Sequence, residues 1–356
     1  MSELKVNAIT DASGGNTASI NGATPTTDNT MGRNRVINGD MRIDQRNAGA
    51  SVTANNVYSV DRWIALSDTS GKWAFQQNSG SVTPPVGFTN YLGGVSSSAY
   101  SPISSDYFGM QQRIEGFNVA DFGWGTSNAK TVTLSFWVRS SLTGTFGGSL
   151  MNSAQNRSYP FPYTISSADT WEYKTITISG DTTGTWNTNS SAGIFVFFSL
   201  GAGSSRVGTA NAWTGTANVF APSGSVDVVG TSGATFYITG VQLEAGSVAT
   251  SFERRHYGQE LILARRYYQR QGIGADWDGA STSFYGGSIE LSPAMRATPS
   301  ATLTFGDTTS NINTSFNAGL GYAPINYTAD YFGWQIQGAT AARAYTWSTF
   351  NFSAEL

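Results

Sequence analysis

Aromatic side chains are the residues of this sequence best suited to bind a ligand. The chain has 10 Trp, 16 Tyr and 20 Phe. Flat Trp and Tyr rings stack on sugar rings, while nearby Asn, Asp, Gln or Arg side chains bind the hydroxyl groups. The predicted contacts come from two C-terminal stretches: Trp277, Tyr285, Tyr322, Tyr327, Tyr331 and Trp334. The competing interpretation, which also applies to Trp171, Trp186 and Trp213, is that these rings form the interior of β domains.

Residues that could support catalysis are scarce. Asp276 and Asp278 flank Trp277, and a carboxyl pair about 5–10 Å apart can hydrolyse a glycosidic bond. A turn is the favoured interpretation, ahead of a metal site or catalysis. His256 is the single histidine and there are no cysteines, which excludes three-histidine and thiolate zinc sites and disulfides within one chain. We therefore expect no catalytic residues, no metal and no cofactor.

A second charged cluster lies near the N-terminus. Asp40 and Asp44 alternate with Arg42 and Arg46. This spacing favours a local ladder of ion pairs that holds the chain in place. A calcium site or a charged interface is the alternative, since calcium takes several carboxylate oxygens.

The overall composition excludes several classes of function. The net charge is −3 and only 12% of the 356 residues are charged, whereas sequence-independent nucleic-acid binding requires a basic face. No apolar run reaches 18 residues, so we expect no membrane insertion. The first residues contain no hydrophobic segment, so we expect no secretory signal peptide.

Elements that could position these side chains are mostly short strands. Along 131–140 the even-numbered Val132, Leu134, Phe136 and Val138 share one face, and the odd-numbered Thr133, Ser135, Trp137 and Arg139 share the other. Further strands are predicted at 171–179, 194–200 and 235–243, with a bulge at Gly240, where the alternation shifts phase. Many short strands without helices predict a jelly-roll sandwich over 35–253.

Regions on either side of this sandwich differ from it. Residues 1–34 are poor in apolar side chains and predict an extended arm that is either disordered or docked onto a partner. Leu4, Val6 and Ile9 are the residues expected to make the docking contact. Residues 271–356 predict a small β-sandwich with strands at 285–292, 301–305, 331–337 and 344–352.

One segment has helical spacing. In the linker 254–270, Tyr257, Leu261, Ala264 and Tyr268 follow a 4-3-4 pattern, which is typical of a coiled-coil seam. A helix with this seam could lie on a symmetry axis. The alternative is a surface linker helix packed on its own domain. The predicted fold class is therefore all-β, with an arm, a jelly roll, a short helix and a small C-terminal β-sandwich.

Several stretches in order resemble bacteriophage fibre proteins. Residues 4–9 resemble a fibre attachment peptide, and 34–47 with 58–63 resemble the entry to a tail-fibre jelly roll. Residues 241–254 resemble the closing strand of a carbohydrate-binding-module-like jelly roll. In such fibres this strand is commonly followed by a helix ending in Arg-Tyr-Tyr, here 266–268, and by a stretch like 293–299.

The resemblance implies a virion protein, and the scarcity of paired carboxylates predicts that it is not an enzyme. It implies a homotrimer that is anchored to other virion proteins through residues 1–34 and binds host cell-surface polysaccharide through its β domains. Tail and capsid attachment are not separated by these motifs. The alternatives are a decoration protein without a receptor role, a polysaccharide-degrading enzyme and a free carbohydrate-binding module.

Overall fold

The chain is almost entirely β-structure, as the sequence predicts. The computed structural model describes residues 32–53, 55–277, 284–308, 322–337 and 344–356. The described residues form two compact units. The first contains the described residues up to 42 together with 49–59 and 63–254, and the second contains 43–48, 60–62 and 255–356.

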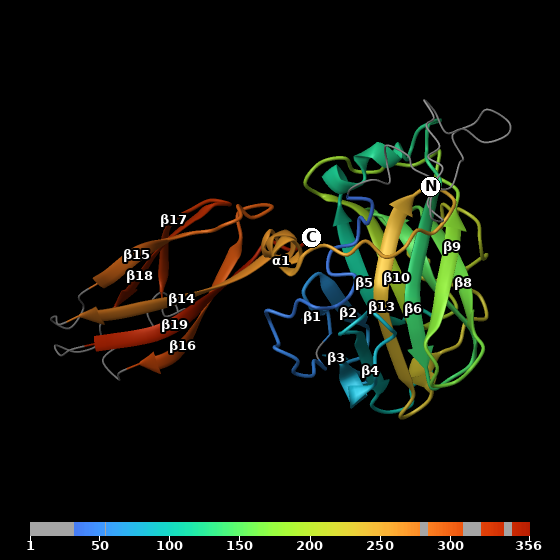
Figure 1. Cartoon of the computed structure of the whole chain (residues 1–356), viewed down its shortest axis with the longest axis horizontal. Coiled ribbons are helices and arrows are strands. Elements are labelled where there is room, and N and C mark those ends of the chain that lie inside the picture. The colour runs from blue at the N-terminus through green and yellow to red at the C-terminus, as the bar shows by residue number, and fades with distance from the viewer. Residues whose placement is uncertain (1–31, 54, 278–283, 309–321, 338–343) are drawn as a thin grey trace, which may run out of the picture. The chain divides into compact units, whose positions relative to one another are not determined.

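Two antiparallel sheets form the first unit (Figure 1). The six-stranded sheet has the order β1 (Val57–Val60), β2 (Trp63–Ser67), β5 (Tyr107–Glu115), β10 (Ala192–Ala202), β7 (Gly144–Asn152) and β8 (Ser158–Ile165). The five-stranded sheet has the order β3 (Trp73–Gln77), β4 (Leu92–Ser96), β13 (Thr235–Ala245), β6 (Val132–Ser140) and β9 (Glu172–Ile178). A short parallel pair, β11 (Val207–Gly208) and β12 (Ala221–Pro222), and four 3₁₀ turns at 79–81, 116–118, 120–122 and 228–230 complete the unit.

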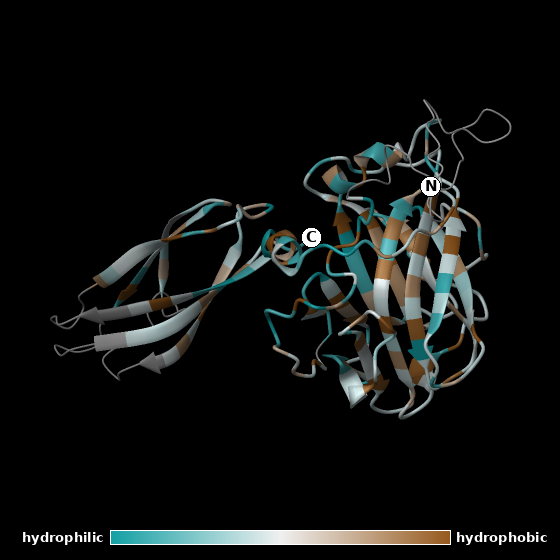
Figure 2. Cartoon of the chain, viewed as in Figure 1, coloured by the Kyte–Doolittle hydropathy of each residue, from teal (hydrophilic) through white to brown (hydrophobic). Residues whose placement is uncertain are grey.

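The core of the sandwich follows the predicted alternation. The even-numbered apolar residues of β6 are fully buried, and the Phe136 ring meets Phe198 of β10 at 4.9 Å between centroids. Hydrophobic and hydrophilic residues alternate along the strands (Figure 2). Because successive side chains point to opposite faces, the odd-numbered residues of β6 lie on the outer face of the five-stranded sheet.

Gly240 forms the predicted bulge in β13. The register between β13 and β6 shifts between Thr239 and Gln242, and Gly240 has φ of +62°. Glycine adopts this left-handed conformation without the steric cost that a Cβ would add. The bulge therefore reverses the in–out alternation in the middle of the strand.

The second unit contains α1 (Tyr257–Arg265) and two three-stranded sheets. Their orders are β14 (Tyr268–Trp277), β19 (Ala344–Ser353) and β16 (Ser300–Thr308), and β15 (Phe284–Glu290), β18 (Tyr331–Gln337) and β17 (Ala323–Tyr327). Phe332 and Phe350, one from each sheet, meet at 5.1 Å between ring centroids. The small β-sandwich predicted for the C-terminal region is thus present in its described residues.

The predicted helical seam is wrong. Tyr268 lies in β14, where it is paired with Ser353 of β19, and the helix ends at Arg265. Within the helix Tyr257 is exposed while Ala264 is fully buried, so the four positions do not form one continuous face. The helix packs within the second unit, as the surface-linker alternative expects. Leu4, Val6 and Ile9 lie outside the described residues.

Ion pairs hold residues 43–48 and 60–62 in the second unit. The Arg62 guanidinium, only 1% exposed, pairs with the Glu355 carboxylate and lies 3.5 Å from the centroid of the Tyr267 ring. Arg46 also pairs with Glu355, at 3.0 Å. The expected ladder is thus only partly local, because Arg46 pairs with Glu355, which is more than 300 residues away in the sequence.

Candidate functional site

A groove on the outer face of the five-stranded sheet is the best-formed candidate site. Its volume is about 450 Å³, within the range of about 300–1,000 Å³ typical of small-ligand sites. Side chains and backbone from β6, β9, β13 and two loops form its walls. The lining residues are Phe88, Trp137, Tyr173, Gly240, Ala249, Thr250, Ser251, Phe252 and Arg254, all within the first unit.

Trp137 and Tyr173 form the aromatic part of the groove. The two residues are direct partners in the antiparallel pairing of β6 and β9, and their ring centroids are 5.4 Å apart. Direct partners in such a pair project from the same side of the sheet. Tyr173 is 43% exposed and Trp137 is half-buried, so both present ring surface to solvent.

The bulge in β13 lets two rings approach the backbone. A Cβ on Gly240 would lie 2.6 Å from a ring carbon of Phe88 and 3.2 Å from a ring carbon of Trp137. The first distance is shorter than a van der Waals contact, so a larger residue would push Phe88 away. Glycine at this position therefore serves both the backbone conformation and the shape of the groove.

Buried polar residues of β13 fix the loop that forms the other wall. The Glu244 carboxylate accepts hydrogen bonds from the Thr250 backbone amide at 2.8 Å and the Thr250 hydroxyl at 2.6 Å. The Gln242 side chain donates to Glu244 and accepts from the Glu253 amide, at 2.8 and 2.7 Å. Both β13 side chains are fully buried, and buried polar groups require such partners. The loop is therefore held in place before any ligand arrives.

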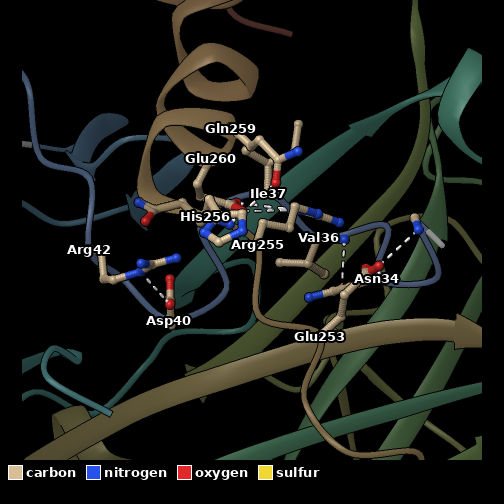
Figure 3. A network of polar contacts seen from close by, with 12 residues as sticks. Asn34, Val36, Ile37, Asp40, Arg42, Glu253, Arg255, His256, Gln259 and Glu260 are labelled. Carbon is tan, nitrogen blue, oxygen red and sulfur yellow. Dashed lines mark hydrogen bonds and ion pairs between the residues drawn. The ribbon is translucent and has the colours of Figure 1, made fainter. Parts of the chain in front are cut away.

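The entry segment of the sandwich braces the same loop. The Glu253 carboxylate accepts hydrogen bonds from the backbone amides of Gly32 and Asn34, both at 2.8 Å. The Asn34 side chain is buried, donates to the Val241 carbonyl and accepts from the Leu243 amide. Figure 3 shows Asn34 and Glu253 side by side in this network. Residues of the stretches 34–47 and 241–254, which resemble phage fibres, thus hold the loop of the groove in place.

Four polar groups in the groove have no hydrogen-bond partner within the described part of the chain. They are the Trp137 indole N–H, the Tyr173 hydroxyl, the Ser251 hydroxyl and the Arg254 guanidinium. Arg254 instead lies over two rings, 4.7 Å from the Phe88 centroid and 5.7 Å from that of Phe252. The planes of the Trp137 and Tyr173 rings are tilted by 47° to one another. An aromatic surface of this kind, bordered by uncommitted donors, suits a ligand that has an apolar face and many hydroxyl groups.

Two of the predicted contacts are core residues, which corrects the expectation for them. Tyr322 and Trp334 are each only 4% exposed and belong to the core of the second unit. The Tyr322 hydroxyl donates to the Ala301 carbonyl, and the Trp334 ring packs near Phe350. A small sandwich needs large rings to fill its interior, so these two cannot present a face to a ligand.

The remaining predicted contacts do not share one face of the sheet, because Tyr327 is paired with Phe332 and Tyr331 points to the opposite side. Tyr285, Tyr327 and Tyr331 are 37–42% exposed and lie on three different strands of one sheet. The side chain of Trp277 is outside the described residues. A ligand role for these four therefore stays a prediction.

Tryptophans of the first unit outside the groove are engaged in packing. Trp186 and Trp213 pack edge-on against Trp124, at 4.7 and 5.3 Å between centroids. The Trp171 indole N–H donates to the Thr83 carbonyl at 2.9 Å. These contacts agree with the interpretation that the three tryptophans pack against other residues. A smaller cavity of about 160 Å³ borders Trp124 and Trp186.

The charged candidates have structural surroundings. Asp40 pairs with Arg42 at 2.5 Å (Figure 3), and the Asp44 carboxylate accepts from the Asn47 amide. His256 precedes the first turn of α1, where its backbone amide donates to the Gln259 side chain. Asp278 and the side chain of Asp276 lie outside the described residues. No three His, Cys, Asp or Glu side chains among the described residues gather in a metal-binding arrangement.

Sequence reasoning missed the two central residues of the groove. The sequence places Trp137 on the polar face of its strand, among Thr133, Ser135 and Arg139. A large aromatic ring on a solvent-facing side is the sequence feature that could have identified it as a ligand contact. Tyr173 carries the same signal on β9, where it lies between half-buried neighbours. The loop residues 249–254 give no comparable signal, because their position depends on long-range hydrogen bonds.

Comparisons with known proteins give only distant likenesses. No family model and no curated protein matches the sequence. Among solved structures, the enzymatically active domain of tailspike protein 4 from bacteriophage CBA120 is 10% identical, with 60% of this chain and 21% of that chain covered and a TM-score of 0.33. A putative sugar binding protein from Bacteroides thetaiotaomicron is 12% identical, with 60% and 100% covered and a TM-score of 0.37. A family 11 carbohydrate-binding module from Clostridium thermocellum is 14% identical, with 58% and 99% covered and a TM-score of 0.27.

The described residues contain no helix long and apolar enough to cross a membrane.

Proposed function

We propose that this chain binds glycans through the groove on its five-stranded sheet. The observation that carries the proposal is the adjacent pair of the half-buried Trp137 and the exposed Tyr173 on the outer face of the sheet. The C–H face of a pyranose ring can cover such a surface, while its hydroxyl groups meet the uncommitted groups of Ser251 and Arg254. Because the walls are already fixed by buried hydrogen bonds, little ordering cost opposes binding.

We propose binding rather than hydrolysis. The groove is lined by aromatic, small and hydroxyl-bearing residues and one arginine, with no carboxyl group among them, whereas glycoside hydrolysis generally needs two carboxyl groups. The enzyme alternative predicts that the purified chain releases oligosaccharides from a polysaccharide that it binds. The binding proposal predicts that the polysaccharide stays intact.

At a finer level, we propose that the protein is a trimeric fibre of a phage virion. This part rests on the resemblance of residues 4–9, 34–47 and 241–254 to phage fibres. A shallow glycan site has a Kd of about 1 mM, or about −4 kcal/mol. Three linked sites can raise the avidity by a factor of about 100–10,000 without any new contact. A weak groove would then suffice for adhesion to a host polysaccharide.

Light scattering tests the oligomeric part of the proposal. Three chains of 37.8 kDa give a solution mass of about 113 kDa, whereas a stable monomer would contradict the trimer. Deletion of residues 1–31 keeps the contacts of Gly32 and Asn34 with Glu253 and should leave a folded protein that no longer joins the virion. A truncated chain that still joins the virion would contradict the anchoring role and leave the glycan proposal standing.

A glycan array tests the binding proposal. Wild type should bind a defined set of glycans, and Trp137→Ala and Tyr173→Ala should each lower the signal strongly. Phe117→Ala is the matched control, because Phe117 is a 61% exposed aromatic residue of the same unit and does not line the groove. Equal binding by wild type and the two groove variants would refute the site. A decoration protein without a receptor role predicts no glycan binding by any of them.

A further inference from the structure

Arg254 gives the groove a positive charge, and its guanidinium forms no ion pair with a carboxylate among the described residues. We propose that the glycan bound in this groove is acidic and places a carboxylate, sulfate or phosphate group against the Arg254 guanidinium. This inference rests on the proposed glycan-binding function and names the chemical class of the ligand. The inference concerns only the Arg254 side chain, so the groove could bind glycans even if none of them is acidic.

The guanidinium is held in place by aromatic and backbone contacts. It lies over the rings of Phe88 and Phe252, which themselves meet edge to face with centroids 5.3 Å apart. A Cβ on Gly87, a residue with φ of +88°, would lie 2.9 Å from the Arg254 Nη2 atom. No hydrogen bond to a described residue occupies the N–H groups of the guanidinium, so they can donate to a ligand. The guanidinium therefore lies against these residues without forming an ion pair with a described carboxylate.

The carboxylates closest to Arg254 in the sequence and structure have other partners. Glu253 accepts two backbone amides, and Glu244 is buried within its bonds to Gln242 and Thr250. Burial raises the pKa of Asp40, and Arg42, which pairs directly with it, opposes this rise more than Arg254 does. None of the described carboxylates therefore hydrogen-bonds to Arg254.

An anionic group on the ligand would satisfy this position better than a neutral hydroxyl. Arg254 is exposed, so an anionic group of a ligand can reach its guanidinium from solvent. A hydrogen bond between two charged groups is roughly twice as strong as one between neutral groups. Carboxylates, sulfates and phosphates can also accept two parallel N–H bonds from one guanidinium. The Ser251 hydroxyl, exposed on the same loop, can donate to the same anion.

The test compares acidic and neutral glycans on one array, with wild type, Arg254→Gln and Arg254→Lys. Polygalacturonate supplies carboxylates and its methyl-esterified form is the neutral counterpart, and dextran sulfate is paired with dextran in the same way. A phosphorylated mannan and plain mannan form the third pair, and sialylated and desialylated oligosaccharides extend the set. The pair that differs most in binding identifies the anion.

We expect wild type to prefer the acidic member of at least one pair. Arg254→Gln should raise Kd for that member about tenfold or more, as expected for loss of a charge-assisted hydrogen bond, and should change binding of neutral glycans little. Arg254→Lys should restore part of the affinity, because it keeps the charge but not the planar fork. Increasing salt should weaken wild-type binding to the acidic glycan and leave Arg254→Gln less affected.

Arg206→Gln is the matched control. Arg206 also lies over two rings of the first unit, those of Tyr107 and Phe220, each 5.9 Å from its centroid, and it does not line the groove. Its loss should not change glycan binding. Thermal unfolding of all variants shows whether Arg254→Gln still folds, and Arg254→Lys provides the second test if it does not.

Two results would overturn the inference. One is binding of neutral glycans only, in a manner that depends on Trp137, which would leave the proposed function standing and remove the acidic ligand. The other is binding of acidic glycans with equal affinity by wild type and folded Arg254→Gln and Arg254→Lys. Absence of binding to every glycan would instead overturn the proposed function, and this inference with it.

Discussion

Asp61 should make the stability of the second unit depend on pH. Its side chain is fully buried and accepts hydrogen bonds from the backbone amide of Gln45, at 3.1 Å, and from the Gln45 side chain. The nearest cation, on Arg46, lies 3.9 Å away and is shared with Glu355. Burial outweighs these favourable contacts and raises the pKa of Asp61 from 3.8 to about 6.

The sign of the effect follows from the protons that each state binds. Between pH 3.8 and about 6 the folded protein keeps a proton on Asp61 that the unfolded chain has lost. The free energy of unfolding therefore falls as pH rises through this window. A pKa rise of this size corresponds to about 3 kcal/mol, and the loss is complete above pH 6. This behaviour is the reverse of that expected for a carboxylate stabilised by its ion pair.

Asp61→Asn isolates this contribution, because asparagine has a similar shape and does not titrate. Urea unfolding at pH 3.5 and pH 7 would be followed by hydrogen exchange at the backbone amides of β14 and β19, which report on the second unit. The stability of wild type relative to Asp61→Asn should fall by about 3 kcal/mol between the two pH values. If the stability difference between wild type and Asp61→Asn is the same at both pH values, burial does not raise the pKa of Asp61. If the difference increases with pH, the ion pair with Arg46 outweighs burial.

Three further substitutions test other parts of the structure. Glu355→Gln should destabilise the second unit by about 3–5 kcal/mol, because Arg62 would stay buried without its partner; an unchanged thermal midpoint would contradict this. Phe350→Ala should cost about 3–5 kcal/mol in thermal unfolding, as expected for a large cavity in a small core, and a loss below 1 kcal/mol would contradict the packing described. Gly240→Ala should cost about 1–3 kcal/mol and weaken glycan binding by displacing Phe88; unchanged affinity on the array would show that the bulge does not shape the site.

Strands of the sandwich could be predicted because their period is local. The apolar face of β6 and the bulge at Gly240 follow directly from the sequence, since side chains alternate strictly along a strand. The end of α1 could not be predicted this way. Tyr267 leaves the helix to stack against Arg62, a contact between residues distant in the sequence. Long-range pairs of this kind have no local period.

The aromatic candidates show what composition alone cannot decide. Tyr331, Phe332, Trp334 and Ile336 are close neighbours on β18, yet Tyr331 is exposed and the other three are buried. The even-numbered positions share one face, so the alternation on this strand already separates core from surface. A count of aromatic residues treats Trp334 and Tyr331 alike, whereas the alternation of side chains along the strand places Trp334 in the core and Tyr331 on the surface. The same rule places Trp137 on the outer face of β6.

The central claim is that a glycan binds against Trp137. The most direct measurement is a titration of protein labelled with ¹⁵N-tryptophan, using the strongest glycan from the array, with the Trp137 indole signal assigned from Trp137→Phe. We predict that this signal shifts progressively with added glycan, while that of Trp63, which is fully buried in the sandwich, stays in place. Shifts confined to the tryptophans of the second unit, with Trp137 unchanged, would contradict the account.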